Sequence, residues 1–155
     1  MIRRAEERDI ERVEELLYQV QDVHAEGRPD YFYKGAKKYT ADELKEIFTD
    51  DSRPVYVYED ESAQILGYVF LIHQITEGSH SQKDRRTLYI DDLCVDETSR
   101  GHHVGTALFE FTENLARSQH FDSLTLNVWE CNPKARKFYE KQHMDVLKTT
   151  LEKRL

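Results

Sequence analysis

The residues best suited to chemistry form a short turn at 100–106, which reads Arg-Gly-His-His-Val-Gly-Thr. An apolar, β-branched run at 87–95 precedes it and apolar residues at helical spacing follow it, so the turn leads from a strand into a helix. The first N–H groups of a helix lack partners within the helix, and the helix dipole adds positive charge there. Gly101 and Gly105 allow close backbone approach, and Arg100 adds a fixed charge. The turn predicts a phosphate site; the plainer interpretation is an ordinary strand–loop–helix joint.

A second segment with possible chemistry lies downstream. Residues 123–129 alternate between apolar and polar types, as a strand does. A helix is expected to follow, because Asn132 is a good N-cap and Pro133 suits the first helical position. The phosphate fingerprints of nucleotide-binding folds, G-x-x-x-x-G-K-[ST] and G-x-G-x-x-G, are both absent. A nucleotide-binding fold is therefore not indicated.

The two segments together resemble the GCN5-related N-acetyltransferases, the GNAT superfamily. Arg100 and Gly105 match the outer positions of that family's phosphate motif, Q/R-x-x-G-x-G/A. Its later motif, N-x-x-A-x-x-F-Y-E-K-x-G-F, is matched by Asn132, Ala135, Phe138, Tyr139, Glu140 and Lys141. The sequence departs from the pattern where His103 and His143 replace glycines and Met144 replaces an aromatic residue. A histidine at these glycine positions is costly if its φ is positive.

The resemblance implies acetyl-CoA as the acetyl donor. Its diphosphate would lie on the turn formed by Arg100, Gly101, His102, His103, Val104, Gly105 and Thr106. Its pantetheine arm would pair with the backbone of Leu93, Cys94 and Val95, as an added strand would. The helix after Asn132, with Ala135 and Phe138, would flank the other side of the bound donor.

Acetyl transfer to an amine involves two proton movements. A lysine-like ammonium (pKa ~10.4) must lose a proton, and a departing thiolate (thiol pKa roughly 8.5) benefits from gaining one. Tyr139 coincides with the family's usual acid, and its alternative role is core packing beside Phe138. Asp91 matches an acidic residue of polyamine acetyltransferases in the superfamily. Only one of Asp91 and Asp92 is expected to face the acceptor, because successive strand residues point to opposite faces. Glu130 is a rival base acting through water, and a merely structural pairing of Asp91 is the plainer interpretation.

The acceptor side is expected to involve the aromatic segment at 31–34. Tyr31 and Tyr33 are the candidates there, and their rings could hold an amine by cation–π contact or fix the loop onto the core. The resemblance thus predicts an N-acetyltransferase in which a primary amine of a small molecule or peptide attacks acetyl-CoA directly in a ternary complex. The alternative is a non-catalytic acyl-CoA-binding sensor or interaction module. A homodimer is plausible for the superfamily.

Composition limits the other possibilities. A chain of 155 residues fits a single domain, 1–155. The net charge of −8 and the pI near 5.4 argue against nucleic-acid or anionic-membrane partners and are compatible with a cationic acceptor. No apolar run approaches the roughly 20 residues that span a bilayer. Cys94 and Cys131 give no disulfide framework or metal-ligand spacing, so no metal and a cytoplasmic location are expected.

The expected fold class is α/β with a mixed sheet. Patterning predicts strands at 1–5, 55–59, 64–75, 87–95, 123–129 and 145–155, and helices at 10–24, from 40, at 106–119 and after 132. Asp9 and Thr40 are the expected N-caps, and Gly67 is a possible bulge. The resemblance implies a mostly antiparallel sheet with two splayed parallel strands and helices on both faces.

Overall fold

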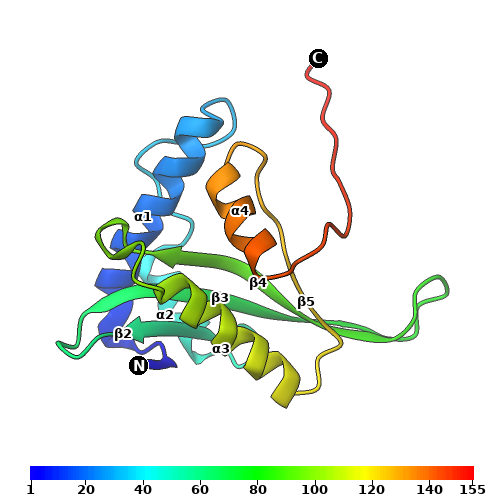
Figure 1. The fold of residues 1–155 in the computed structure, drawn as a ribbon, viewed down its shortest axis with the longest axis horizontal. Coiled ribbons are helices and arrows are strands. Elements are labelled where there is room, and N and C mark those ends of the chain that lie inside the picture. The colour runs from blue at the N-terminus through cyan, green and yellow to red at the C-terminus, as the bar shows by residue number, and fades with distance from the viewer.

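The computed structural model describes residues 1–155 and contains one five-stranded sheet in the order β1-β2-β3-β4-β5 (Figure 1). The strands are β1 (Ile2–Arg4), β2 (Val55–Glu59), β3 (Ile65–Thr76), β4 (Arg85–Val95) and β5 (Ser123–Leu126). Strands β1 to β4 are antiparallel, whereas β4 and β5 run parallel. The helices are α1 (Ile10–Gly27), α2 (Ala41–Thr49), α3 (Val104–Ser118) and α4 (Pro133–Lys141), with short 3-10 turns η1 (Glu7–Asp9) and η2 (Glu97–Ser99). The mixed sheet predicted from the sequence is confirmed.

The central strand β3 is buried on both faces and separates two hydrophobic cores. Tyr68 and Phe70 pack with α1 and α2 on one face. Val69 and Leu71 pack with α3 on the other face, because successive residues of a strand alternate in direction. Helices therefore cover both faces of the sheet, as an apolar central strand requires.

The two predicted helix N-termini differ in how they are capped. Thr40 forms the predicted capping box, in which its hydroxyl accepts from Glu43 N at 3.2 Å and Glu43 accepts from Thr40 N at 2.9 Å. Asp9 precedes α1, but its side chain makes no N-cap hydrogen bond to that helix. Its carboxylate instead pairs with Arg3 and accepts from Glu6 N at 2.8 Å. The carboxylate thus ties β1 to the start of α1.

A bulge occurs in β3 beside Gly67, where one was predicted. Tyr58 pairs with Gly67 and Glu59 with Ile65, so Leu66 is the extra residue. A Cβ atom on Gly67 would lie 2.6 Å from the carbonyl oxygen of Cys94. Glycine here allows β3 to lie close against the end of β4, where the candidate site begins.

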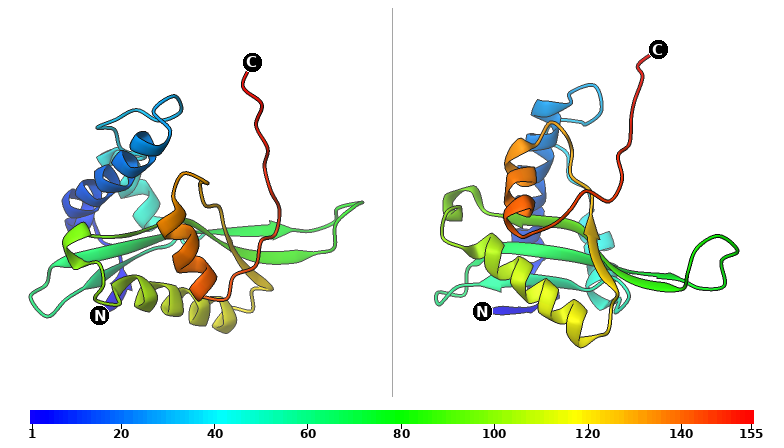
Figure 2. Two further views of the ribbon diagram at one scale, coloured as in Figure 1. Left: turned by 45° about the horizontal axis from the view of Figure 1, so that its top comes forward. Right: turned by 45° about the vertical axis from the view of Figure 1, so that its right-hand side comes forward.

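The prediction of a sixth strand at 145–155 is wrong. These residues form no helix or strand, and every one of them is exposed. They leave α4 and run outward as an extended tail, which is clearest in Figure 2. The residue pattern is that of a strand, but a strand needs a neighbour to satisfy its backbone groups, and no strand of this chain pairs with it. None of the four helices combines the length and the apolar composition that a membrane-spanning helix requires.

Candidate functional site

The parallel strands β4 and β5 separate part-way along their length. Their pairing ends at Ile90 and Leu126, while β4 continues to Val95. The edge of β4 that faces β5 is therefore unpaired from Asp91 onwards, and its backbone groups are free to bind a ligand. This open edge includes the strand end that was predicted to receive the pantetheine arm, namely Leu93, Cys94 and Val95. The side chain of Cys94 is buried towards α1, so only its backbone is available at the edge.

The turn after β4 leads into the N-terminus of α3, as predicted. The helix begins at Val104 rather than Thr106, with His103 as N-cap at φ 61°. The first intrahelical bond runs from Ala107 N to His103 O at 2.9 Å. The N–H groups of Val104, Gly105 and Thr106 therefore have no partner within the helix. The first turn also contains no acidic residue that would repel an anion.

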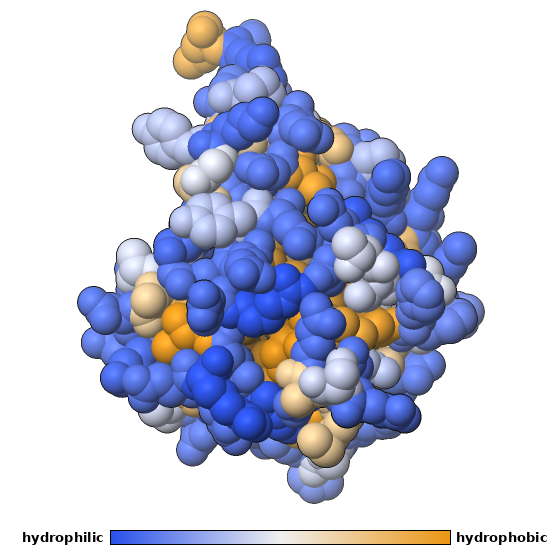
Figure 3. Space-filling view, turned by 90° about the vertical axis from the view of Figure 1, so that its left-hand side faces the viewer, coloured by the Kyte–Doolittle hydropathy of each residue, from blue (hydrophilic) through white to orange (hydrophobic).

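The side chains of the turn leave this N-terminus accessible. Val104 is buried in the core under α3, which fixes the helix start. Arg100, Gly101 and His102 are exposed, and Arg100 takes part in none of the salt bridges of the chain. Figure 3 views the molecule from this side and shows apolar atoms in a band between hydrophilic side chains. The turn thus presents free N–H groups and an unpaired guanidinium on the same side of the molecule.

Helix α4 packs against the start of α3. Its N-cap Asn132 uses its side-chain oxygen to accept from Ala135 N at 3.2 Å. Phe138 comes within 3.5 Å of the position that a Cβ of Gly105 would take, and Val95 comes within 3.4 Å of the same position. The three predicted parts of the cofactor site, on β4, α3 and α4, therefore converge at Gly105.

Tyr139 follows Phe138 on α4 and packs beside the core under α3. Its ring centroid lies 6.2 Å from that of Phe109. Burial raises the pKa of Tyr139, and the negative charge of Asp92 on β4 raises it further. The phenol of Tyr139 therefore keeps its proton at neutral pH and lies close enough to β4 to interact electrostatically with the carboxylate of Asp92.

A bulge in β4 corrects the expectation that Asp91 and Asp92 point to opposite faces. Phe70 pairs with Asp92 and Leu71 with Ile90, so Asp91 is an extra residue without a partner in β3. An extra residue interrupts the alternation of side chains. Both carboxylates consequently lie on the α1 and α2 face, where Asp91 contacts Tyr39 and Asp92 contacts Tyr68.

The two carboxylates have different surroundings. Asp91 Oδ2 accepts hydrogen bonds from Lys38 Nζ at 2.9 Å and from Tyr39 OH at 2.7 Å. Asp92 Oδ2 accepts from Tyr68 OH at 2.8 Å. Burial raises the pKa of Asp92 to about 6, and the hydrogen bond from Tyr68 opposes that shift. Asp91 is thus held in an ion pair, whereas Asp92 is poised to exchange a proton near neutral pH.

The predicted acceptor segment is partly occupied by an aromatic cluster. Trp129, in the loop after β5, has ring centroids 5.0 Å from Tyr31 and 4.9 Å from Phe32. His24 of α1 joins the cluster, and burial lowers its pKa. The cluster links α1 and the α1–α2 segment to the loop after β5, which bounds the gap between β4 and β5. Tyr31 therefore has a packing role in addition to any role in binding.

Two of the predicted acceptor-side residues lie in solvent. Tyr33 is 85% exposed. The side chain of Glu130 is 90% exposed and pairs with Arg136 at 3.0 Å. The structure does not bring either residue to Asp91 or Tyr139.

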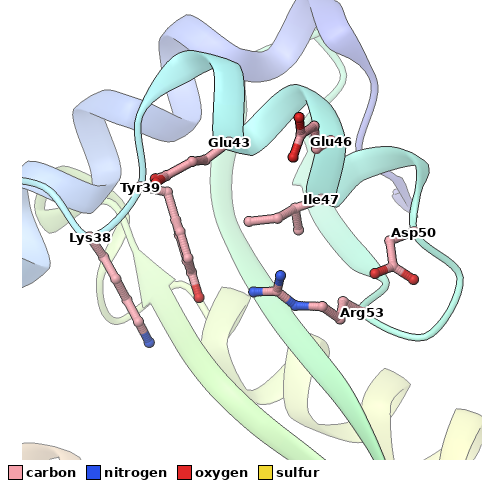
Figure 4. A pocket seen from close by; sticks show the side chains of 7 residues that line it. All are labelled: Lys38, Tyr39, Glu43, Glu46, Ile47, Asp50 and Arg53. Atoms are coloured by element: carbon pink, nitrogen blue, oxygen red, sulfur yellow. The ribbon is translucent and has the colours of Figure 1, made fainter.

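Sequence reasoning missed Lys38, Tyr39 and Tyr68, which contact the acidic pair. Lys38 and Tyr39 also line an open pocket of about 310 Å³ beside α2 (Figure 4). The other lining residues are Glu43, Glu46, Ile47, Asp50 and Arg53. Lys38 and Tyr39 lie a few residues beyond the predicted acceptor segment at 31–34, so a segment extended to residue 39 would have included them. Tyr68 carried no signal, because its place in an apolar strand is typical of core packing.

Comparisons with known proteins agree with this geometry. Residues 17–144 match the family described as "Acetyltransferase (GNAT) family". A crystal structure of a single-site mutant of the BH1408 protein from Bacillus halodurans is 31% identical, with a TM-score of 0.96 over 100% of this chain and 99% of that one. No curated protein matches the chain.

Two more distant structures share the fold. The ribosomal-protein-alanine N-acetyltransferase of Brucella melitensis biovar Abortus 2308 is 17% identical, with a TM-score of 0.71 over 100% of this chain and 99% of that one. The aminoglycoside acetyltransferase meta-AAC0020 from an uncultured soil metagenomic sample is 17% identical, with a TM-score of 0.70 over 100% and 94% of the two chains. With the family match over residues 17–144, the chain belongs to the GNAT family of acetyltransferases.

Proposed function

We propose that this protein transfers an acetyl group from acetyl-CoA to a primary amine of a small molecule or peptide, by direct attack in a ternary complex. The observation that carries the proposal is the open edge of β4 beside the free N–H groups of α3. The edge offers backbone donors and acceptors to an extended amide-containing arm. The helix N-terminus offers an anion site at the end of that edge. Acetyl-CoA combines such an arm with a diphosphate.

The turn fits a diphosphate in charge as well as shape. Val104, Gly105 and Thr106 supply N–H groups at the positive end of a helix whose first turn contains no carboxylate. Arg100 supplies a guanidinium that is in no salt bridge and can bind phosphate oxygens in a bidentate manner. Gly101, at φ 84°, adopts a conformation that other residues rarely take.

Tyr139 is the proposed proton donor to the departing thiolate. Its raised pKa keeps the phenol protonated until negative charge develops beside it. Phe138, the preceding residue, packs near Gly105 at the N-terminus of α3, and Val95 at the end of β4 lies close to the same point. Acetyl-CoA supplies the activated acetyl group. The residues of this chain position the thioester, donate a proton to the thiolate and accept one from the amine.

Asp92 is the proposed proton acceptor for the attacking amine, acting through a water molecule. A pKa of about 6 leaves the group ionised at pH 7 and still basic enough to take a proton. Asp91, expected from the sequence to be the base, already accepts from Lys38 and Tyr39. We propose that Asp91 instead attracts the cationic acceptor, exchanging its contact with Lys38 for one with the substrate ammonium.

The acceptor itself is proposed only as a class. The two distant structures are named for acting on a ribosomal-protein alanine and on aminoglycosides, which are different amine acceptors. In this chain, Asp91 and the pocket of Figure 4 provide carboxylates next to aromatic Tyr39, an arrangement suited to an ammonium group. The cytoplasmic location stays a prediction.

Thermal shift with acetyl-CoA, followed by thiol release across a panel of amines, tests the proposal. We expect stabilisation by acetyl-CoA and turnover with at least one amine. Stabilisation without turnover across the panel would favour the non-catalytic acyl-CoA-binding module. The absence of stabilisation would contradict acetyl-CoA as the donor. Asp91→Asn and Asp92→Asn then separate the carboxylates: we expect the former mainly to raise KM and the latter to remove the acidic limb of the pH–rate profile.

A further inference from the structure

One face of α1 makes polar contacts with the segment that follows β4. Arg12 and Gln19 are two helical turns apart and therefore lie on the same face of the helix. Arg12 forms an ion pair with Asp96. The side-chain oxygen of Gln19 accepts a hydrogen bond from Glu97 N at 3.1 Å. Helix α1 thus holds the chain at the residues that come just before the phosphate turn at 100–106.

Asp96 is at the centre of these contacts and is only 5% exposed. Its backbone N–H donates to the carbonyl oxygen of Leu66 at 2.8 Å, next to the bulge of β3. Its Oδ1 accepts from Thr98 N at 3.1 Å, which caps η2, and its Oδ2 accepts from Arg12 Nη2. Burial would raise the pKa of Asp96, but the hydrogen bonds from Thr98 and Arg12 lower it overall. The buried carboxylate is therefore ionised at neutral pH and connects η2 to α1.

The guanidinium of Arg12 is itself fixed from three directions. Besides its pair with Asp96, its Nε donates to the carbonyl oxygen of Ile65 on β3 at 3.1 Å. Its Nη1 pairs with Glu15, one turn along α1, at 2.6 Å. The planar guanidinium keeps these three contacts in one fixed arrangement. Arg12 therefore ties α1, the central strand and the end of β4 together at one point.

The phosphate turn has little packing of its own. Residues 100–103 are exposed, and two of them, Gly101 and His103, have φ values of 84° and 61°. A strained segment keeps its conformation only where the surrounding structure fixes it. The buried residues on either side of this exposed stretch are Asp96 before it and Val104 after it. Val104 is fixed by the core under α3, so the other fixed point is the ion pair of Asp96 with α1.

We infer that the ion pair of Arg12 and Asp96 positions the phosphate turn for acetyl-CoA, acting through the backbone of η2. The inference rests on the proposed function, because it takes the turn at 100–106 as the diphosphate site. The pair fixes the start of η2, which leads directly into the turn. Donors that are already in place bind more tightly, because binding then carries no entropy cost of ordering them. Arg12 and Asp96 are thus positioning residues, and Gln19 has a smaller part in the same role.

Calorimetry and steady-state kinetics with acetyl-CoA test this role. Arg12→Met should raise the Kd for acetyl-CoA about tenfold, and Gln19→Ala, which removes a single neutral hydrogen bond, about threefold. Both variants should raise KM for acetyl-CoA while kcat at saturation and KM for the amine stay unchanged, because the reacting groups are not altered. Gln19→Ala decides the test if Arg12→Met does not fold. Unchanged Kd in these variants, or a loss of kcat instead of affinity, would overturn the inference.

Arg3→Met is the matched control for general loss of stability. Arg3 pairs with buried Asp9 and with Glu59, so its loss also leaves a buried carboxylate without a partner. It lines the same open pocket of about 480 Å³ as Arg12, but it forms no hydrogen bond or ion pair with residues 94–106. Arg3→Met should therefore bind acetyl-CoA like the wild type. An equal loss of affinity in both arginine variants would overturn the positioning role.

Hydrogen exchange of the ligand-free protein separates this inference from the proposed function. Arg12→Met should speed exchange at 97–106 and leave the body of α3, at 107–116, as protected as it is in Arg3→Met. Faster exchange spread equally over both segments would overturn the inference, because the pair would then stabilise the whole fold and not the turn. A wild-type protein that does not bind acetyl-CoA would instead reject the proposed function, whatever the exchange rates at the turn.

Discussion

Replacing Asp92 by asparagine is expected to stabilise the fold at neutral pH. Asparagine has nearly the same shape, and its side-chain oxygen can still accept the hydrogen bond from Tyr68. The change removes an ionised carboxylate from a site where burial raises its pKa. The gain in the free energy of unfolding should therefore depend on pH in a way that follows the titration of Asp92.

The magnitude follows from the pKa shift. The pKa of Asp92 rises from 3.8 to about 6, and each unit corresponds to about 1.4 kcal/mol, so ionisation costs up to ~3 kcal/mol of stability above pH 6. Because the pKa is raised on folding, the stability that Asp92 confers is fully present below its unfolded value and is lost as the pH rises through about 6. The advantage of Asp92→Asn should accordingly be ~1.4 kcal/mol larger at pH 8 than at pH 5.

Urea unfolding of both proteins between pH 5 and pH 8 measures this difference. Asp51→Asn is a matched control, because Asp51 is an exposed carboxylate paired with Arg4 at the surface. The control should change the free energy of unfolding by no more than a few tenths of a kcal/mol at either pH. Parallel stability curves for wild type and Asp92→Asn would refute the assignment of a raised pKa to Asp92, and with it the argument for Asp92 as the base.

Three further substitutions test other parts of the account. Tyr139→Phe should lower kcat about 100-fold with little change in acetyl-CoA affinity, because the change removes the proton donor and keeps the aromatic ring. Full turnover at saturating substrate would contradict the role of Tyr139 as proton donor. His143→Gly should raise the free energy of unfolding by ~1 kcal/mol, because His143 has φ 60°, a conformation that glycine adopts without strain. His80→Gly is the control: His80 has no positive φ, so this change should bring no such gain. Gly67→Ala should lower the free energy of unfolding by roughly 1–3 kcal/mol, because the added Cβ meets the Cys94 carbonyl. If urea unfolding gave the wild-type stability, β3 and β4 would be able to move apart and avoid this clash.

The sequence left open whether His103 and His143 have positive φ, and the structure shows that both do. His103 and His143 occupy glycine positions of the family pattern and keep φ values of 61° and 60°. Their positive φ shows that the turn before α3 and the turn after α4 retain the left-handed conformation without glycine. Neighbouring packing, such as Val104 in the core, therefore fixes these turns against the local cost.

The failures of prediction come from pairing, which a single sequence does not specify. The alternation rule separated Asp91 from Asp92, but the bulge places both carboxylates on one face. The apolar pattern at 145–155 is strand-like, yet a strand forms only where an edge is available. In both cases, the pairing with a neighbouring strand determined the structure: the direction of the Asp91 side chain in one, and the absence of a strand at 145–155 in the other.

Calorimetry with acetyl-CoA tests the central claim most directly, namely that the N-terminal turn of α3 binds the diphosphate. Arg100→Glu should weaken binding at least tenfold, because it replaces an unpaired cation of the turn with an anion. Arg85→Glu, at the exposed first residue of β4, changes the net charge equally and should bind like wild type. Equal affinities for wild type and Arg100→Glu would contradict the phosphate-site assignment.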